Sequence, residues 1–300
     1  MRLRAATRGS ELALWQTRHV ARLLAALDPA VEVETVIVTT EGDRRAEAPI
    51  AEMGGKGVFA AEVQRAVLDG RADLAVHSAK DLPSVTPDGL SLAAVPERGD
   101  PRDVLVGSRL DAIPDRGLVG TGSPRRRAQL AHLRPDLRFS DLRGNIATRL
   151  AKSAGFDAIV MAAAALERLD QIERVSEVLG IDRFLPQAGQ GALAIECRDD
   201  DEATAGVLGS IEHAASRKAV DSERAYLAEL GGDCRLPAGA FAEVRSGGVF
   251  LHAFIASPDG SRLRRSEQAG DDAAVVGRTL ARRLLDEEGG AELLAPTVSP

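Results

Sequence analysis

The residues best placed to do chemistry are Lys80 and Asp81, which follow a short apolar stretch in DLAVHSAKDLP, residues 73–83. The apolar stretch is too short for a helix and fits a strand buried on both faces, and Pro83 prevents that strand from continuing. Ligands of open α/β sheets bind beyond the carboxyl ends of the strands. The pattern therefore favours Ser78, Lys80 and Asp81 as site residues; an ordinary ion pair at a strand end is the alternative.

A second candidate is an anion site in GTGSPRRRAQL, residues 120–130. Thr121 and Ser123 directly precede a predicted helix with proline in its first turn. Backbone N–H groups, the two hydroxyls and the positive helix end would converge there on one anion. Arg125 and Arg126 strengthen this prediction. At helical spacing at most two of the three consecutive arginines can face one cleft, so the third is expected in solvent. A simple helix cap is the alternative.

Further arginines stand at predicted strand exits or on the helices that follow them: Arg8 and Arg143 in the turns, Arg149 and Arg168 on the helices. Lysine occurs only at positions 56, 80, 152 and 218, so nearly all positive charge is arginine. Arginine binds carboxylates and phosphates with two parallel hydrogen bonds. A compositional bias would explain the number of arginines but not their placement. The placement predicts a polyanionic ligand with several carboxylates or phosphates.

Two glycine-containing loops carry further candidate site residues, a lysine and a cysteine. Three glycines surround Lys56, but the spacing is not that of a phosphate-binding P-loop, so a loop that closes over a ligand is expected. Cys234 lies on a loop between glycines and a proline, and its reactivity depends on surroundings that the sequence leaves open. The other cysteine, Cys197, ends an apolar strand and is predicted to be a core residue.

The elements that position these residues form two α/β units and a smaller third one. Strands are predicted at 2–7, 31–40, 74–76, 90–95, 104–107, 118–120, 139–142, 158–161, 192–197, 241–245 and 249–256. Helices are predicted at 11–27, 58–68, from 124 onward, at two segments that carry Arg149 and Arg168, at 214–230 and at 273–285. The stretches 96–103 and 184–191 are rich in glycine and proline and predict two connections between the units.

The predicted fold class is therefore α/β, with two periplasmic-binding-protein-like α/β lobes, a cleft between them, and a small α+β C-terminal domain. The expected domains are 1–98 plus 189–215, 99–188, and 216–300. A chain of 300 residues with 44% hydrophobic composition is long enough for two or three such domains.

Composition also narrows the function. The net charge of -7 argues against a nucleic-acid partner. Two cysteines and five scattered histidines predict no metal site and no disulfide scaffold. The absence of a long apolar run and of a signal-peptide pattern predicts a cytoplasmic protein that does not enter a membrane.

Eight motifs, in order, resemble the porphobilinogen deaminase (hydroxymethylbilane synthase) family of tetrapyrrole biosynthesis. They are RAATRGSELALWQ, EGDR, GGKGVF, AVHSAKDLP, GTGSPRRRAQL, LRGNIATRL, LPQAGQGALAIECR and GGDCRLPAGA, between Arg4 and about Ala242. The resemblance implies a three-domain, monomeric, cytoplasmic transferase. It implies that four porphobilinogen molecules are joined head to tail with loss of ammonia on a bound dipyrromethane, and that water then releases hydroxymethylbilane.

The resemblance also implies roles for particular residues. Asp81 matches the catalytic aspartate, and Cys234 matches the cysteine that holds the dipyrromethane cofactor through a thioether. The implied cofactor-binding residues are Ser78, Lys80, Asp81, Thr121, Ser123, Arg125, Arg126, Arg143 and Gly144. The implied substrate-binding residues are Arg8, Lys56, Arg149, Arg168 and Gln190, with Asp43 on the loop behind them. Acetate and propionate groups on each pyrrole make the oligopyrrole the polyanion that the arginines predict.

Three positions, Glu11, Pro124 and Asp233, depart from the family pattern. The first two suit helix N-termini. Asp233 places a carboxylate beside Cys234, which is expected to raise the pKa of the thiol and slow cofactor loading. Two other functions fit parts of the chain. A two-lobed binding protein for an acidic metabolite would leave Asp81 and Cys234 without a role, and a phosphate-handling transferase would need clustered carboxylates for a metal ion.

Overall fold

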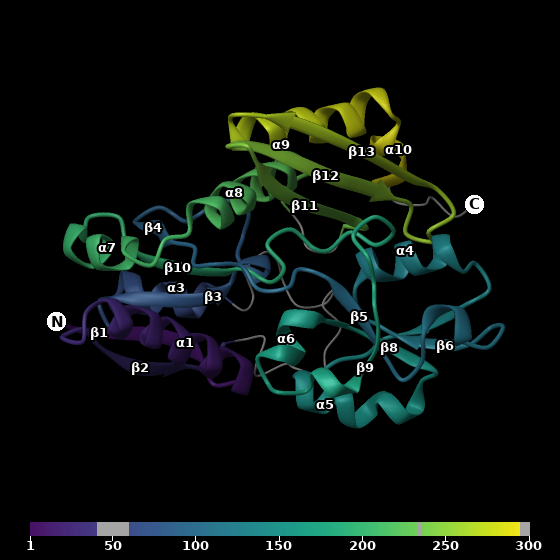
Figure 1. Cartoon of the computed structure of the whole chain (residues 1–300). Coiled ribbons are helices and arrows are strands. Elements are labelled where there is room, and N and C mark those ends of the chain that lie inside the picture. The colour runs from purple at the N-terminus through teal and green to yellow at the C-terminus, as the bar shows by residue number, and fades with distance from the viewer. Residues whose placement is uncertain (41–59, 233–235, 295–300) are drawn as a thin grey trace.

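The computed structural model describes residues 1–40, 60–232 and 236–294. Three β-sheets, each covered by helices, make up two α/β lobes and a C-terminal domain, which lie at the left, right and top of Figure 1. The first lobe contains strands β1 (Arg2–Arg8), β2 (Glu32–Val38), β3 (Leu74–Ser78), β4 (Leu90–Ala94) and β10 (Leu193–Arg198), in the order β2-β1-β3-β10-β4. Its helices are α1 (Glu11–Leu27), α3 (Ala61–Leu68) and α7 (Glu202–Gly209).

Alternation along β1 shows how the first lobe is layered. Leu3 and Ala5 belong to a core shared with α1 and α7, whereas Ala6 belongs to a core shared with α3. Successive residues of a strand point to opposite faces, so both faces of this sheet are covered by helices. A sheet buried on both faces reads as a continuous apolar run, which is the pattern seen in β3.

The second lobe repeats this arrangement. Its strands are β5 (Asp103–Val106), β6 (Leu118–Gly120), β7 (Arg138–Ser140), β8 (Ala158–Ala162) and β9 (Val175–Val178), in the order β7-β6-β8-β5-β9. Its helices are α4 (Pro124–Leu133), α5 (Ile146–Lys152) and α6 (Ala163–Glu167). Leu130 of α4 packs on one face of the sheet, and Leu150 of α5 and Leu166 of α6 pack on the other.

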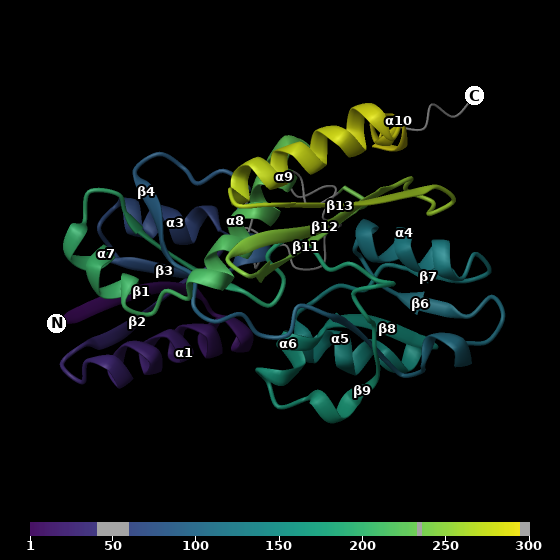
Figure 2. The same ribbon diagram turned by 45° about the horizontal axis from the view of Figure 1, so that its top comes forward.

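The C-terminal domain is a three-stranded antiparallel sheet with helices on one face, which Figure 2 shows from the edge. Its strands are β11 (Ala238–Arg245), β12 (Gly248–Ala256) and β13 (Leu263–Gly270), and its helices are α8 (Ala214–Glu229), α9 (Ala273–Arg282) and α10 (Gly290–Leu294). Short 3-10 turns occur at Ala79–Asp81, Leu110–Ala112, Ser153–Gly155 and Ile172–Arg174, and a π-helical turn occurs at Arg283–Glu287. Tyr226 of α8 and Leu280 of α9 are fully buried in the core of this domain.

Two crossings, residues 95–102 and 179–192, connect the lobes and lie side by side. Gly99 N donates to Gly191 O at 3.1 Å, which joins the two crossings directly. Each crossing leads into a strand, β5 or β10, that is antiparallel to both of its neighbours, while the strands that precede the helices run parallel. The carboxyl ends of parallel strands in the two sheets, β1 and β3 in the first and β7 and β8 in the second, therefore supply residues to the region between the lobes.

The predicted fold class is confirmed, and helix α1 has the predicted bounds. The residue limits of the three domains stay a prediction. Strands β9 and β13 and helix α7 were not predicted, and α6 ends one residue before Arg168 instead of carrying it. Among the helices of the described residues, none has both the length and the apolar character needed to cross a bilayer.

Candidate active site

A cavity of about 1330 Å³ lies between the two lobes. Eight of the predicted site residues line it: Arg8, Ser78, Lys80 and Asp81 from the first lobe, and Arg126, Arg143, Gly144 and Arg149 from the second. Arg8 and Ser78 are the last residues of β1 and β3, and Lys80 and Asp81 lie in the turn that follows β3. Arg143 and Gly144 lie in the loop between β7 and α5, as expected at the carboxyl edge of an α/β sheet. The fold therefore brings together residues that are up to 141 positions apart, from Arg8 to Arg149.

On the side of the first lobe, strand β3 delivers Ser78 and a single 3-10 turn delivers Lys80 and Asp81. The Ser78 hydroxyl accepts a hydrogen bond from Gln16 Nε2 at 2.7 Å. Lys80 is partly buried, and its Nζ donates to Gln190 Oε1 at 3.2 Å. The Asp81 carboxylate is exposed to the cavity. A fixed ammonium group therefore lies beside an accessible carboxylate.

The surroundings of Lys80 change its acidity. Burial is the main cause that lowers the pKa of Lys80, and Arg126 and Arg125 also lower it, while Asp81 and Asp103 raise it. The net effect is a pKa of about 8 instead of 10.5. At neutral pH the ammonium form still predominates. Lys80 is therefore positively charged in the state that would bind a carboxylate, and it loses its charge as the pH rises through about 8.

On the side of the second lobe, Arg143 and Arg149 approach each other. Arg149 Nε donates to Gly144 O at 2.8 Å, and burial together with Arg126 and Arg143 lowers the pKa of Arg149 to about 10. Arg143 packs over Gly122, where a Cβ would lie only 2.9 Å from the guanidinium carbon. Arg143 Nε is buried and has no hydrogen-bond partner among the described residues. The arrangement leaves a buried cationic donor available for an anion.

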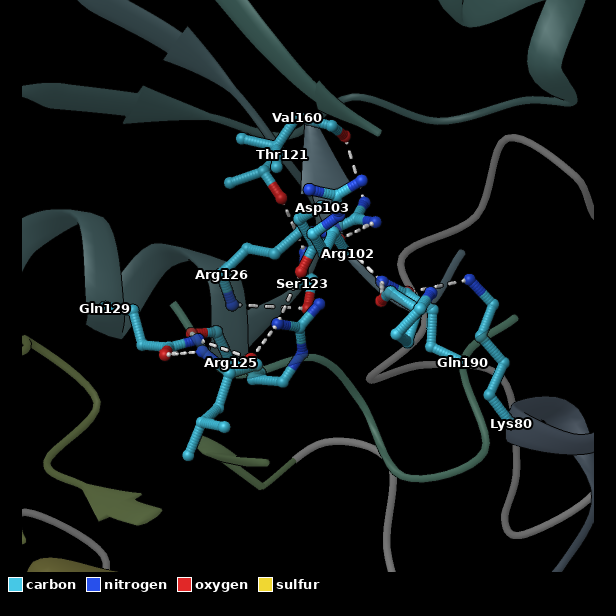
Figure 3. Close-up of polar contacts among 12 residues, drawn as sticks. Lys80, Arg102, Asp103, Thr121, Ser123, Arg125, Arg126, Gln129, Val160 and Gln190 are labelled. Carbon is cyan, nitrogen blue, oxygen red and sulfur yellow. Dashed lines mark hydrogen bonds and ion pairs between the residues drawn. The ribbon is translucent and has the colours of Figure 1, made fainter. Parts of the chain in front are cut away.

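Arg125 and Arg126 are both buried, and both form ion pairs with Asp103, as Figure 3 shows. The third consecutive arginine, Arg127, is exposed and lies over the Phe139 ring at 5.7 Å, as expected from helical spacing. Only Arg126 of the three lines the large cavity. Arg125 instead lines a small neighbouring cavity that also contains Ser123 and Leu236.

The two hydroxyls of the predicted anion site cap helix α4. Ser123 Oγ accepts from Arg126 N at 3.4 Å, and Ser123 N donates to Thr121 Oγ1 at 3.2 Å. Neither Thr121 nor Ser123 lines the large cavity. The cap confirms the predicted start of the helix, and anion binding at these two residues stays a prediction.

Arg168 and Gln190 lie outside the lining of the cavity. The Arg168 guanidinium lies over the ring of Trp15 on α1 at 5.5 Å, and its Nη2 donates to Gly191 O at 2.6 Å. It therefore bridges the second lobe, the first lobe and a crossing. Gln190 is buried and binds Asp103, Pro101 and Lys80.

Four predicted residues, Asp43, Lys56, Asp233 and Cys234, lie outside the described residues. Cys197 is buried in the core of the first lobe, as predicted.

Some residues of the site were not predicted from the sequence. Lys152 lines the cavity, and its position three residues after Arg149 on the same helix was an available signal. Gln16 and Asp103 gave no such signal, because their partners are distant in the sequence.

The cavity suits a large polyanion. Among the described residues that line it, the cationic side chains outnumber the carboxylates: Arg8, Lys80, Arg126, Arg143, Arg149 and Lys152 against Glu11, Asp81 and Asp141. Its volume exceeds the roughly 300–1,000 Å³ typical of small-molecule pockets. Together with the unpartnered Nε of Arg143, these features fit a multi-ring compound with several carboxylates.

Comparisons with known proteins agree with this description. Residues 3–206 match the family model "Porphobilinogen deaminase, dipyromethane cofactor binding domain", and residues 218–286 match "Porphobilinogen deaminase, C-terminal domain". Curated porphobilinogen deaminases from two strains of Acidithiobacillus ferrooxidans are each 43% identical over 297 residues, which cover 97% of this chain and 97% of theirs.

The solved structures that the chain matches are more distant. DctP7, a Bordetella pertussis extracytoplasmic solute receptor that binds pyroglutamic acid, gives a TM-score of 0.40 at 12% identity, covering 77% of this chain and 83% of its own. A marine metagenome solute binding protein specific for aromatic acid ligands gives 0.41 at 10% identity, covering 75% and 78%. The assignment rests on the family models and the curated relatives: the chain belongs to the porphobilinogen deaminase family.

Proposed function

We propose that this chain is a hydroxymethylbilane synthase, a transferase that joins porphobilinogen units head to tail with loss of ammonia and releases the linear tetrapyrrole by hydrolysis. The observation that carries the proposal is the cavity between the lobes, where the Asp81 carboxylate shares the lining with Arg126, Arg143 and Arg149. Arginines bind the acetate and propionate groups of pyrroles through paired hydrogen bonds. The Asp81 carboxylate adds a negative charge, which can stabilise positive charge on the reacting carbon of the substrate.

Asp81 is the proposed catalytic residue. Loss of ammonia from porphobilinogen leaves a positively charged methylene carbon, and a carboxylate held close to it stabilises that charge. The same carboxylate is able to move a proton to the departing amine or from the pyrrole. Lys80 next to it binds a substrate carboxylate, since its ammonium group is charged below about pH 8.

Cys234 is proposed to hold a dipyrromethane through a thioether, and this group, when bound, supplies the ring carbon to which the first substrate is joined. Leu236, two residues after Cys234 in the sequence, lines a small cavity together with Ser123 and Arg125 of the second lobe, which supports this proposal. The residues proposed to bind the cofactor are Ser78, Lys80, Asp81, Thr121, Ser123, Arg125, Arg126, Arg143 and Gly144. Those proposed to bind the substrate are Arg8, Lys56, Arg149, Arg168 and Gln190.

The same proposal includes three domains with limits at 1–98 plus 189–215, 99–188 and 216–300, a monomeric state, a cytoplasmic location and no nucleic-acid partner. The separate helix-covered sheets support the division into domains.

The intact mass of the purified protein tests the attachment. Wild-type protein incubated with porphobilinogen is expected to gain the mass of two linked pyrroles, and Cys234→Ser is expected to gain nothing. Cys197→Ser is the matched control, because that thiol is buried in the core of the first lobe and should leave the mass gain intact. A wild-type protein that gains no mass and releases no ammonia would refute the proposed function.

A further inference from the structure

We propose that Asp103, the first residue of β5, is a positioning residue that fixes Arg126 and, through Gln190, Lys80 in the geometry that receives substrate carboxylates. The proposal rests on the proposed function, which supplies the carboxylates. Asp103 is fully buried and does not line the cavity, so its action on the reaction would be indirect.

The two oxygens of the Asp103 carboxylate have different partners: Oδ1 accepts hydrogen bonds, and Oδ2 forms an ion pair. Oδ1 accepts from Arg126 Nε at 3.0 Å, from Arg126 Nη2 at 2.6 Å and from Gln190 Nε2 at 3.0 Å. Oδ2 lies 2.7 Å from Arg125 Nη1. Figure 3 shows this carboxylate between the two arginines and Gln190, with Lys80 beyond Gln190. One carboxylate therefore contacts groups from α4 and from the second crossing.

The carboxylate itself has a fixed position. The backbone of Asp103 pairs with Ala162 on β8, and its carbonyl oxygen accepts from Leu179 N at 2.9 Å. The guanidinium groups of Arg125 and Arg126 hold the pKa of Asp103 far below its usual range, so the group is an anion at every physiological pH. Without this anion, two buried cations would repel each other with no compensating charge.

Asp103 also determines which way the Gln190 amide faces. Gln190 Nε2 has two acceptors, Asp103 Oδ1 at 3.0 Å and Pro101 O at 2.8 Å, so the amide oxygen is directed to Lys80 Nζ at 3.2 Å. A donor in place of Oδ1 would favour the flipped amide, which presents an NH₂ group to the ammonium of Lys80. The chain of contacts therefore runs from the second lobe through a crossing to the lysine beside Asp81.

Asp103→Asn tests the proposal, because it keeps the shape of the side chain and removes the charge. The matched control is Asp73→Asn. Asp73 also lies between two arginines, Arg4 at 2.7 Å and Arg198 at 3.7 Å. It directly precedes β3, at the end of that strand away from Lys80, and it does not line the cavity. The measurements are the rate of mass gain from porphobilinogen, KM and kcat of the loaded protein, the pH dependence of kcat/KM, and Tm.

We expect Asp103→Asn to load at least about tenfold more slowly and to raise KM about tenfold, the loss that corresponds to one charged hydrogen bond. The basic limb of its kcat/KM profile should move to lower pH. Lys80 faces Asp81, Arg125, Arg126 and Asp103, and removal of one of its two anions disfavours the ammonium form. Asp73→Asn should keep the loading rate, KM and basic limb of the wild type, whatever its Tm.

Asp103→Asn with the loading, KM and basic limb of the wild type, and only a lower Tm, would overturn the proposal. If Asp103→Asn does not fold, the KM and the basic limb of Asp103→Glu test the proposal instead. This substitution keeps the charge but displaces it by one methylene, so a raised KM with an unmoved basic limb supports the proposal and a wild-type KM refutes it. Failure of the proposed function is distinguishable, because the wild-type protein itself would then neither gain mass nor turn over.

Discussion

The removal of Glu223 should have a large and calculable effect on stability. Glu223 lies on α8 and is fully buried, and its oxygens contact Arg98 Nη1 at 2.6 Å and Nη2 at 3.2 Å. The same carboxylate accepts from Gly189 N at 2.6 Å and from Ala242 N at 2.8 Å. It therefore joins both crossings to the C-terminal domain through one side chain.

The magnitude follows from the groups that Glu223→Ala leaves behind. The Arg98 side chain is only 9% exposed, and removal of one member of a buried ion pair costs about 3–5 kcal/mol. Two backbone N–H groups lose their acceptor, which adds about 1 kcal/mol each. A loss of about 5 kcal/mol is comparable with the lower end of the usual total stability, roughly 5–15 kcal/mol. At about 2–4 °C per kcal/mol, Tm should fall by at least about 10 °C.

Calorimetry of the loaded protein measures this effect, with Glu229→Ala as the control. Glu229 is on the same helix and pairs with Arg282 at 2.7 Å, but the Arg282 side chain is 65% exposed, so the loss should be at most about 1 kcal/mol. The double variant Arg98→Met with Glu223→Ala should recover part of the loss, because no buried charge is left unpaired. Equal Tm values for Glu223→Ala and Glu229→Ala would refute the argument that the buried ion pair of Glu223 with Arg98 stabilises the protein more than an exposed one.

Three further predictions concern the site. Asp81→Asn should retain the cofactor mass while kcat falls by about 10² or more, and a near-normal kcat would remove Asp81 from the mechanism. The kcat/KM of the wild type should fall above about pH 8 as Lys80 loses its proton, and this limb should be absent in Lys80→Gln; a limb of equal pKa in both proteins would assign it to another group. Gly189→Ala should lower Tm and raise KM, because φ is +75° and the new Cβ would lie 2.9 Å from Lys80 N. Gly209→Ala, which has open space around its Cβ, is the control, and equal effects would contradict the steric argument.

Features that depend on local sequence were predictable. The bounds of α1 follow from Ser10, whose hydroxyl accepts from Ala13 N at 3.3 Å, and from the helical spacing of its apolar residues. The end of a short apolar strand also located Lys80 and Asp81, because ligand-binding residues of α/β sheets follow the carboxyl ends of their strands.

Features that depend on distant partners were not predictable. Strand β13 reads LRRSEQAG, which has no apolar alternation, and it forms because its backbone pairs with β12 at the edge of a sheet. Asp103 is one acid among many until folding brings it to Arg126, 23 residues later, and Gln190, 87 residues later. Arg168 directly follows α6, and its guanidinium lies over the ring of Trp15, a partner that is distant in the sequence and that local patterns do not indicate. Its predicted role in substrate binding stays a prediction.

The contact between Arg168 and Trp15 has a spectroscopic consequence. Trp15 is the only tryptophan of the chain, and it stacks on His19 at 4.9 Å. Arg168 from the opposite lobe lies over the Trp15 ring at 5.5 Å, and Arg22 of the same helix lies over it at 5.8 Å. Indole emission responds to nearby charge and to solvent. The fluorescence of the unlabelled protein is therefore a single-site signal for the contact between the lobes, and a change in that contact during elongation would change the emission.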